Sequence, residues 1–208
     1  MKGFISLQKE WTSLIQKIIS SPLLHSKWVN TLSYLENCGA RKIAACEHPT
    51  LVKEEMLKHA AEEFRHAHYL KRQLARLSGD PMDTYSLSYM LGGIASLHYL
   101  HALDVRVSRY LKTISSPEEL KAHAYLLVTY AIEKRAEELY PIYDALLRKM
   151  HSPITVKSIL LEEKEHLAEM EKGLLLIPNG VHHARQACTI EGIYCKTWIV
   201  ELSKGCSA

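Results

Sequence analysis

EEMLKHAAEEFRHAHYLKRQL (residues 54–74) contains neither glycine nor proline and has the spacing of an amphipathic helix. Its apolar residues recur three and four positions apart, which places them on one helical face. Glu63 and His66 fall in the same series as Met56 and Leu70. Burying a carboxylate without compensation costs several kcal/mol. This stretch therefore predicts a polar site inside a helical core.

Breakers and caps predict further helices. The expected helices lie at about residues 7–19, 22–46, 50–77, 86–112 and 117–150, with a last one from the HSP break at 151–153 to about 176. Ser116, Pro117 and Glu119 form the sequence signature of a capped helix start. Pro141 predicts a kink inside that helix. SGDPMD (78–83) is the clearest loop, whereas the helix at 86–112 is expected to continue through two glycines.

Composition indicates an ordinary folded chain. The 208 residues are 47% hydrophobic and 24% charged, and the formal charge of +3 is spread along the chain, so neither disorder nor a nucleic-acid partner is indicated. The start has no signal-peptide pattern and no apolar run is long enough to span a membrane, which predicts a cytoplasmic protein. Five cysteines without Cys-x-x-Cys spacing predict free thiols.

Two regions are expected. Residues 1–177 are predicted to form an all-α helical bundle. Residues 178–208 form a tail in which TIEGIYCKTWIV is rich in β-branched and aromatic residues. This tail either covers a face of the bundle or joins a partner subunit, so a homodimer is one of the open alternatives.

The arrangement of residues 54–74 occurs again in the last long helix. There Glu163 and His166 share the apolar series of Ile159, Met170 and Leu174. Each of these two helices thus carries one Glu-x-x-His pair on its inward stripe.

The other two long helices each add an inward acid, Glu36 in one and Glu133 in the other. The midpoint between Glu36 and Glu63 falls at the EHPT break, and the midpoint between Glu133 and Glu163 falls within about a turn of the HSP break. In antiparallel hairpins the acids would therefore lie at matched depths.

Cations must offset these acids if they are buried together. The predicted inward series contain no lysine or arginine, which favours metal ions over ion pairs. Carboxylates supply anionic oxygens that can bridge two cations, and imidazoles supply neutral nitrogens. Four glutamates and two histidines suit two ions; a purely structural polar layer is the alternative.

This pattern resembles the ferritin-like di-iron carboxylate superfamily, in which two helices give one Glu each and two others give Glu-x-x-His. The resemblance covers about residues 22–176 and implies a four-helix bundle with a long helical crossover and extra terminal segments. It implies two iron ions, with manganese or a mixed pair fitting the same ligands. One ion would be held by Glu36, Glu63 and His66 and the other by Glu133, Glu163 and His166, with Glu63 and Glu163 as bridges.

Several nearby residues have open roles. Glu137, one turn past Glu133, is read as an inward acid that replaces it, joins it as a ligand or shuttles protons. Tyr130, one turn before Glu133, is read as a packing residue or as an electron-transfer or hydrogen-bonding residue. His59 is read as a core histidine.

LHYLHALD in the crossover places three polar residues on one helical face, His98, His101 and Asp104. They are read as partners that orient the ligand histidines, or as a rival metal cluster. His182 and His183 are expected to be exposed.

Three functions follow from these readings. The first is an oxidoreductase that activates dioxygen or peroxide to oxidise or hydroxylate a small molecule or modified nucleotide, with electrons from an external donor. The second is iron handling or peroxide detoxification, as in storage ferritins and rubrerythrins, although the Cys-x-x-Cys pairs of full rubrerythrins are missing. The third is a metal-free helical interaction module.

Overall fold

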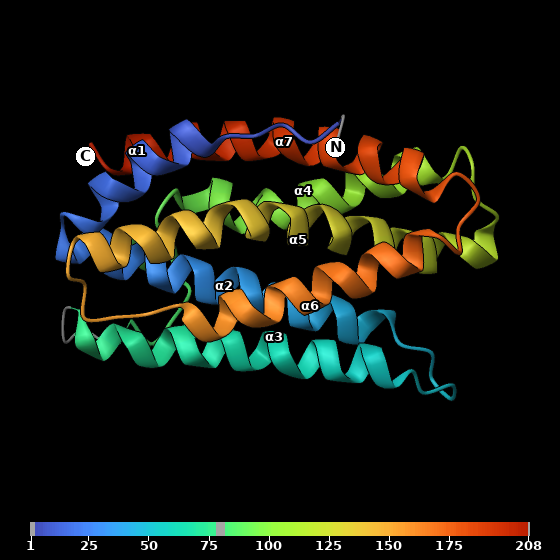
Figure 1. Cartoon of the computed structure of the whole chain (residues 1–208), viewed down its shortest axis with the longest axis horizontal. Coiled ribbons are helices and arrows are strands. Elements are labelled where there is room, and N and C mark those ends of the chain that lie inside the picture. Colours follow the sequence, from blue (N-terminus) through green and yellow to red (C-terminus); the bar gives the residue numbers. More distant parts are fainter. Residues whose placement is uncertain (1–2, 78–81, 208) are drawn as a thin grey trace.

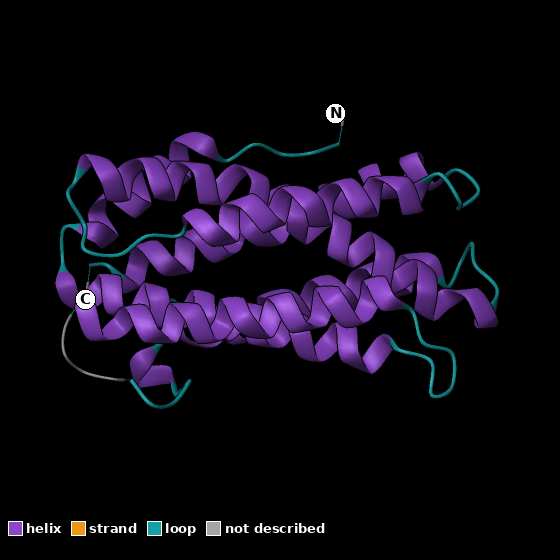
Figure 2. Ribbon diagram, turned by 60° about the horizontal axis from the view of Figure 1, so that its bottom comes forward, coloured by secondary structure: helices purple, strands orange, loops and turns teal. Residues whose placement is uncertain are grey.

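Seven α-helices and two short 3-10 turns make up the computed structural model, which describes residues 3–77 and 82–207. The helices are α1 (Gln8–Ile19), α2 (Pro22–Cys46), α3 (Glu54–Gln73), α4 (Gly93–Leu111), α5 (Pro117–Lys149), α6 (Lys157–Leu174) and α7 (Gly180–Gly205), and the turns are η1 (Leu74–Arg76) and η2 (Leu87–Tyr89). No strand occurs in these residues (Figure 2). The prediction of an all-α fold is confirmed.

The helices are arranged as two antiparallel pairs with additional helices along one side. Figure 1 shows α2 running back along α3 and α5 running back along α6, with α1 and α7 at the edge opposite α3. The crossover between the pairs contains α4, which packs against α5 and α7. The two pairs meet where α2 contacts α5 and where side chains of α3 and α6 reach each other.

Local chemistry explains the start of α5, and it corrects one expected helix boundary. The Ser116 side chain accepts a hydrogen bond from the Glu119 backbone N–H in a complete capping box, and α5 then continues through Pro141. The expected single helix over 86–112 is wrong. Gly92 and Gly93 adopt positive φ angles of 74° and 50°, so η2 ends before them and α4 begins at Gly93.

The remaining differences lie at segment ends. Helices α3 and α6 start about four residues later than expected, at Glu54 and Lys157. The tail forms α7, a helix of 26 residues that the β-branched and aromatic composition did not predict.

Residues 78–81 of the expected loop lie outside the described residues. The five cysteines are free, and no described helix is long and apolar enough to cross a bilayer.

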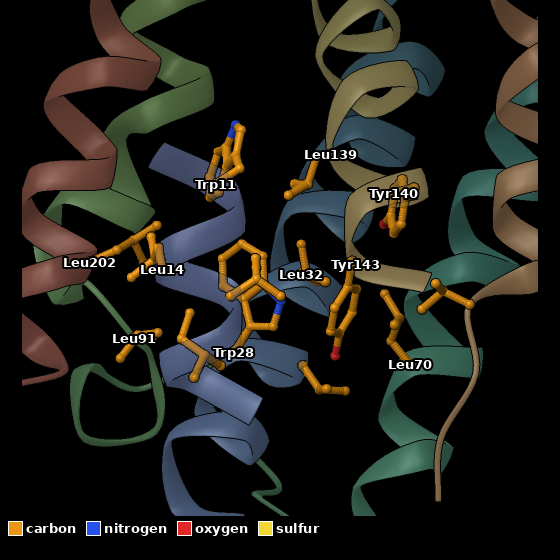
Figure 3. Close-up of a cluster of buried hydrophobic side chains, with 14 of the residues drawn as sticks. Trp11, Leu14, Trp28, Leu32, Leu70, Leu91, Leu139, Tyr140, Tyr143 and Leu202 are labelled. Carbon is orange, nitrogen blue, oxygen red and sulfur yellow. The ribbon is translucent and has the colours of Figure 1, made fainter. Parts of the chain in front are cut away.

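Two apolar clusters fill the core. The larger one contains Trp11, Trp28 and Trp198 from α1, α2 and α7, whose ring centroids lie 5.6–6.0 Å apart; Figure 3 shows its centre. The smaller cluster joins α4, α5, α6 and α7 around Leu103 and Leu127. Along α5 and α6, the polar residues of the predicted site lie between these two clusters.

A buried histidine in the larger cluster makes the folded state sensitive to acid. His25 is 2% exposed, and its Nε2 lies 2.7 Å from the hydroxyl of Tyr143. Burial lowers the pKa of His25 from 6.5 to about 4. Below about pH 6.5 His25 is protonated in the unfolded chain but remains neutral in the folded chain until about pH 4. The free energy of unfolding therefore falls as the pH decreases from about 6.5 toward 4.

We expect this histidine to cost about 2 kcal/mol of unfolding free energy between neutral pH and about pH 5. The measurement is urea unfolding at both pH values for the wild type and for His25→Gln, which keeps a polar partner for Tyr143. The variant should lose less stability on acidification. Equal losses in the two proteins would contradict the assignment.

Candidate metal centre

Four glutamates from four helices meet between the two apolar clusters. Glu36 lies on α2, Glu63 on α3, Glu133 on α5 and Glu163 on α6. The last three are buried, and the Glu36 side chain is only 12% exposed. Gly39 makes room for one of them, because a Cβ there would lie 3.1 Å from Glu63 Oε2.

Their oxygen atoms form two groups together with three histidines. The first group contains Glu36, Glu63, His66 and Glu163, and the second contains His59, Glu63, Glu133 and His166. Within each group one ligand atom per residue lies within 4.8 Å of the others. Glu63 belongs to both groups, so a single carboxylate faces both of them.

Distances in the first group centre on the Nδ1 atom of His66. This nitrogen lies 3.2 Å from Glu163 Oε1, 3.9 Å from Glu36 Oε2 and 4.0 Å from Glu63 Oε1. An imidazole nitrogen thus faces three carboxylates that come from three different helices.

The second group has two imidazoles. His166 Nδ1 lies 3.5 Å from Glu63 Oε1 and 3.8 Å from Glu133 Oε1. His59 Nε2 lies 3.2 Å from Glu133 Oε1 and 3.5 Å from Glu63 Oε1. His59 was read from the sequence as a core histidine. It is buried as expected, but the site surrounds it.

The predicted grouping differs in one further respect. Glu163 was expected to share a group with Glu133 and His166, but its compact group is that of Glu36 and His66. Glu163 Oε2 also lies 3.9 Å from His166 Nδ1. All six predicted ligands are therefore brought together, with His59 as a seventh.

Two further glutamates hold the histidines from the opposite helix. Glu162 of α6 lies with Oε2 2.8 Å from Nε2 of His66 on α3, and Glu62 of α3 lies with Oε2 2.9 Å from Nε2 of His166 on α6. A carboxylate accepts, so each imidazole donates its Nε2–H to the opposite helix, and its Nδ1 faces the acid group. Glu62, which precedes Glu63 in the sequence, thus takes part in the site.

Several buried polar atoms of the site have no hydrogen-bond partner, which indicates room for a cation. His66 Nδ1, His166 Nδ1, Glu133 Oε2 and Glu163 Oε1 are buried and have no hydrogen-bond partner. Buried polar atoms are rarely left unpaired without a reason. Within residues 3–77 and 82–207, no lysine or arginine forms an ion pair with the four inner carboxylates. Carboxylate oxygens and imidazole nitrogens suit divalent metals, so this buried His/Glu group can hold a metal ion.

Without a cation, burial and neighbouring charges shift the pKa values of several site residues toward protonation. Burial, together with the charges of Glu63 and Glu163, raises the pKa of Glu36 well above its usual value, and burial beside Glu163 does the same to the pKa of Glu133. Burial alone would lower the pKa of His166, but Glu163, Glu62 and Glu63 raise it to about 9. Burial and the neighbouring charges therefore favour the protonated forms of Glu36, Glu133 and His166.

Metal uptake is expected to release these protons. Because ligands bind in the deprotonated form, the apparent affinity for Zn²⁺ should rise from about pH 6 to about pH 8, with roughly one proton or more released per ion. Isothermal titration in buffers of different ionisation enthalpy counts the protons. A proton count of zero with an affinity independent of pH would contradict this account.

The other residues singled out from the sequence lie outside the two groups. Glu137 was expected to face inward, which is wrong: it is exposed and pairs with Lys134. Tyr130 is fully buried within the smaller apolar cluster. Arg135, two positions after Glu133, is 3% exposed and binds Glu191 of α7. Two sides of α5 are covered, so Glu133 and Arg135 are both buried although they lie two positions apart.

The crossover cluster does not orient the ligand histidines. Asp104 pairs with Lys42, while His98 and His101 are exposed. Tyr140 takes part in the site instead, because its hydroxyl donates to Glu36 Oε1. Tyr140 was part of the inward series, yet nothing in its spacing predicted that partner.

A cavity of about 80 Å³ borders the carboxylates. Glu36, Glu63, Glu133 and Glu163 form part of its wall. Most of the other wall residues are apolar side chains of α2, α4, α5 and α7, among them Leu32, Leu100, Leu139 and Trp198. The metal-binding candidates thus face a partly open, largely apolar space.

The fold and site define an all-helical protein with a buried His/Glu group that can hold metal, compatible with a ferritin-like arrangement. Comparison of the chain with models of known protein families, with curated proteins and with solved structures gives no match.

Proposed function

We propose that α2, α3, α5 and α6 form a ferritin-like four-helix bundle with α4 in its long crossover, and that the chain binds two metal ions. Seven ligand residues arranged in two groups that share Glu63 support this stoichiometry. Iron is the expected metal, and manganese or a mixed pair fits the same nitrogen and oxygen ligands.

The proposed activity is that of an oxidoreductase, which uses dioxygen or peroxide to oxidise or hydroxylate an organic substrate. The observation that carries it is the cavity of about 80 Å³ whose wall includes all four inner carboxylates, since a substrate placed there would lie beside the metals. When bound, an iron pair supplies the redox chemistry that activates oxygen. An external donor supplies the electrons.

The chain's own residues position the ligands and shield the site. Glu162 and Glu62 fix the orientation of His66 and His166, and Tyr140 fixes the Glu36 carboxylate. The apolar wall keeps bulk water from the carboxylates, which strengthens their attraction for cations.

Anaerobic titration with Fe²⁺ followed by exposure to oxygen tests the proposal. Two ions per chain, an optical change on oxygen exposure and iron-dependent oxygen consumption are expected for the wild type, with consumption lost in Glu63→Gln. Glu137→Gln is the matched control, because it removes an exposed acid of α5 outside the two groups. Unchanged consumption in Glu63→Gln would refute the proposal.

Two further measurements separate the alternatives. Purified protein without bound metal after iron-replete expression would favour the interaction module. A large cage in size-exclusion chromatography would favour iron storage, whereas a monomer or dimer supports an enzyme.

A further inference from the structure

The cavity beside the carboxylates can be characterised by the hydrogen-bonding groups that its wall leaves free. Tyr99 donates its hydroxyl to Glu191, Tyr140 donates to Glu36, and Trp198 Nε1 donates to Ser96 Oγ at 2.8 Å. All three donors are therefore used within the protein. None of these donors is left for a ligand, and the unpaired acceptors in the wall, Glu133 Oε2 and Glu163 Oε1, belong to the proposed metal ligands.

Arg135 is the one cationic side chain in the described wall, and its charge is already paired. Its Nε and a terminal nitrogen donate to the Glu191 carboxylate at 2.9 and 2.7 Å, and further donors reach Glu138 and the carbonyl of Ile5. Two carboxylates thus neutralise the guanidinium. A phosphate or carboxylate entering the cavity would meet acids and no unpaired cation.

The size of the space limits the ligand further. An engineered apolar cavity of about 150 Å³ holds benzene, with its six carbon atoms. At about 80 Å³ this cavity is roughly half as large, which corresponds to about three or four non-hydrogen atoms. A purine or pyrimidine ring is too large to lie entirely within it.

We infer that this cavity binds an uncharged, apolar group of about three or four non-hydrogen atoms, such as a short aliphatic chain. That this group is the part of the substrate to be oxidised rests on the proposed function. Leu35, Gly39, Leu100 and Ile132 are only half-buried, so the wall that they form is the side from which a longer molecule could insert its apolar end.

Binding can be tested without any oxygen chemistry. The full chain with methyl-labelled Leu, Ile and Ala is used as purified, and again after loading with redox-inert Zn²⁺. Xenon, propane and acetamide are the probes, and methyl NMR shifts at Leu139, Ile132 and Ala136 report occupancy. Xenon and propane should shift these methyls and saturate in both forms, whereas acetamide should not in the Zn²⁺-loaded form, in which metal occupies the carboxylate oxygens. An equal response to acetamide, or none to xenon and propane, would overturn the inference.

Variants locate the response in the cavity. Ala136→Leu fills the space and should weaken propane binding at least tenfold, while Ala61→Leu makes the same change on the exposed face of α3 and should leave binding unchanged. Leu100→Phe serves the same purpose from α4 if Ala136→Leu fails to fold. Undiminished binding in a folded cavity variant would also overturn the inference.

Chain length distinguishes a free small molecule from the end of a larger one. 1-Hexanol should bind at least as well as propane if the half-buried side opens to a longer chain, and much more weakly if the cavity is closed. The methyl NMR shifts do not depend on oxygen consumption. Probe binding can therefore be observed even if the proposed activity is absent, and the activity can be observed even if the probes do not bind.

Discussion

Glu63→Gln is expected to lose both metal ions. Glu63 is the one residue common to the two groups of ligand atoms, so its neutral amide removes an anionic ligand from each. We expect the metal affinity of each of the two proposed sites to be more than about 100-fold weaker than in the wild type. Elemental analysis after dialysis against a weak chelator gives the stoichiometry. Glu137→Gln should retain both ions.

The same substitution should change the stability of the metal-free protein in the opposite direction. Burial raises the pKa of Glu36, and the nearby charge of Glu63 raises it further, so Glu63 adds to the repulsion between carboxylates in the metal-free site. Removing one charge without changing the volume should stabilise the metal-free fold by about 1–4 kcal/mol in urea unfolding. A variant that keeps two ions, or that is destabilised without metal, would contradict the shared position of Glu63.

Much of the helical framework was predictable because local signals determine it. The capping residues before α5 and the prolines and glycines between helices act within a few residues, and the sequence displays them directly. The start of α4 was missed because Gly92 and Gly93 adopt left-handed conformations that the surrounding apolar pattern conceals. Helix α7 depends on tertiary packing, since Trp198 joins two other tryptophans in the core.

The site was predictable only where one face of a helix is buried. The six predicted ligands follow from periodicity combined with matched depth in two antiparallel pairs. Periodicity failed on α5, where two sides are covered: Arg135 is buried and Glu137 is exposed. His59 was on the inward series one turn before Glu63, but spacing alone cannot separate a ligand from a packed histidine.

The two Glu-Glu-x-x-His segments contain a signal that helical periodicity did not reveal. In each, the first glutamate lies beside the ligand glutamate in sequence but reaches the histidine of the other helix. This exchange joins α3 and α6 through the site. It also makes the orientation of each histidine dependent on the partner helix, which single-helix reasoning could not predict.

Glu62→Leu and Glu162→Leu should therefore act on opposite groups. Glu62→Leu removes the acceptor of His166 and should weaken the group containing His59 and Glu133, whereas Glu162→Leu should weaken the group containing His66 and Glu36. Each loss should be about 10- to 100-fold in metal affinity, because the imidazole loses the partner that fixes its tautomer. Two-step Zn²⁺ titration gives the affinities.

Imidazole ¹⁵N shifts separate positioning from simple loss of stability. Glu62→Leu should alter the tautomer signature of His166 and leave that of His66 unchanged, and Glu162→Leu should do the reverse. Glu165→Leu is the control on α6, because Glu165 lies 3.7 Å from Lys58 and is largely exposed. If each substitution instead altered the ¹⁵N shifts of the histidine on its own helix, the contacts of Glu62 with His166 and of Glu162 with His66 would be contradicted. Because Glu162 also pairs with Arg65, Arg65→Gln shows whether that contact contributes separately.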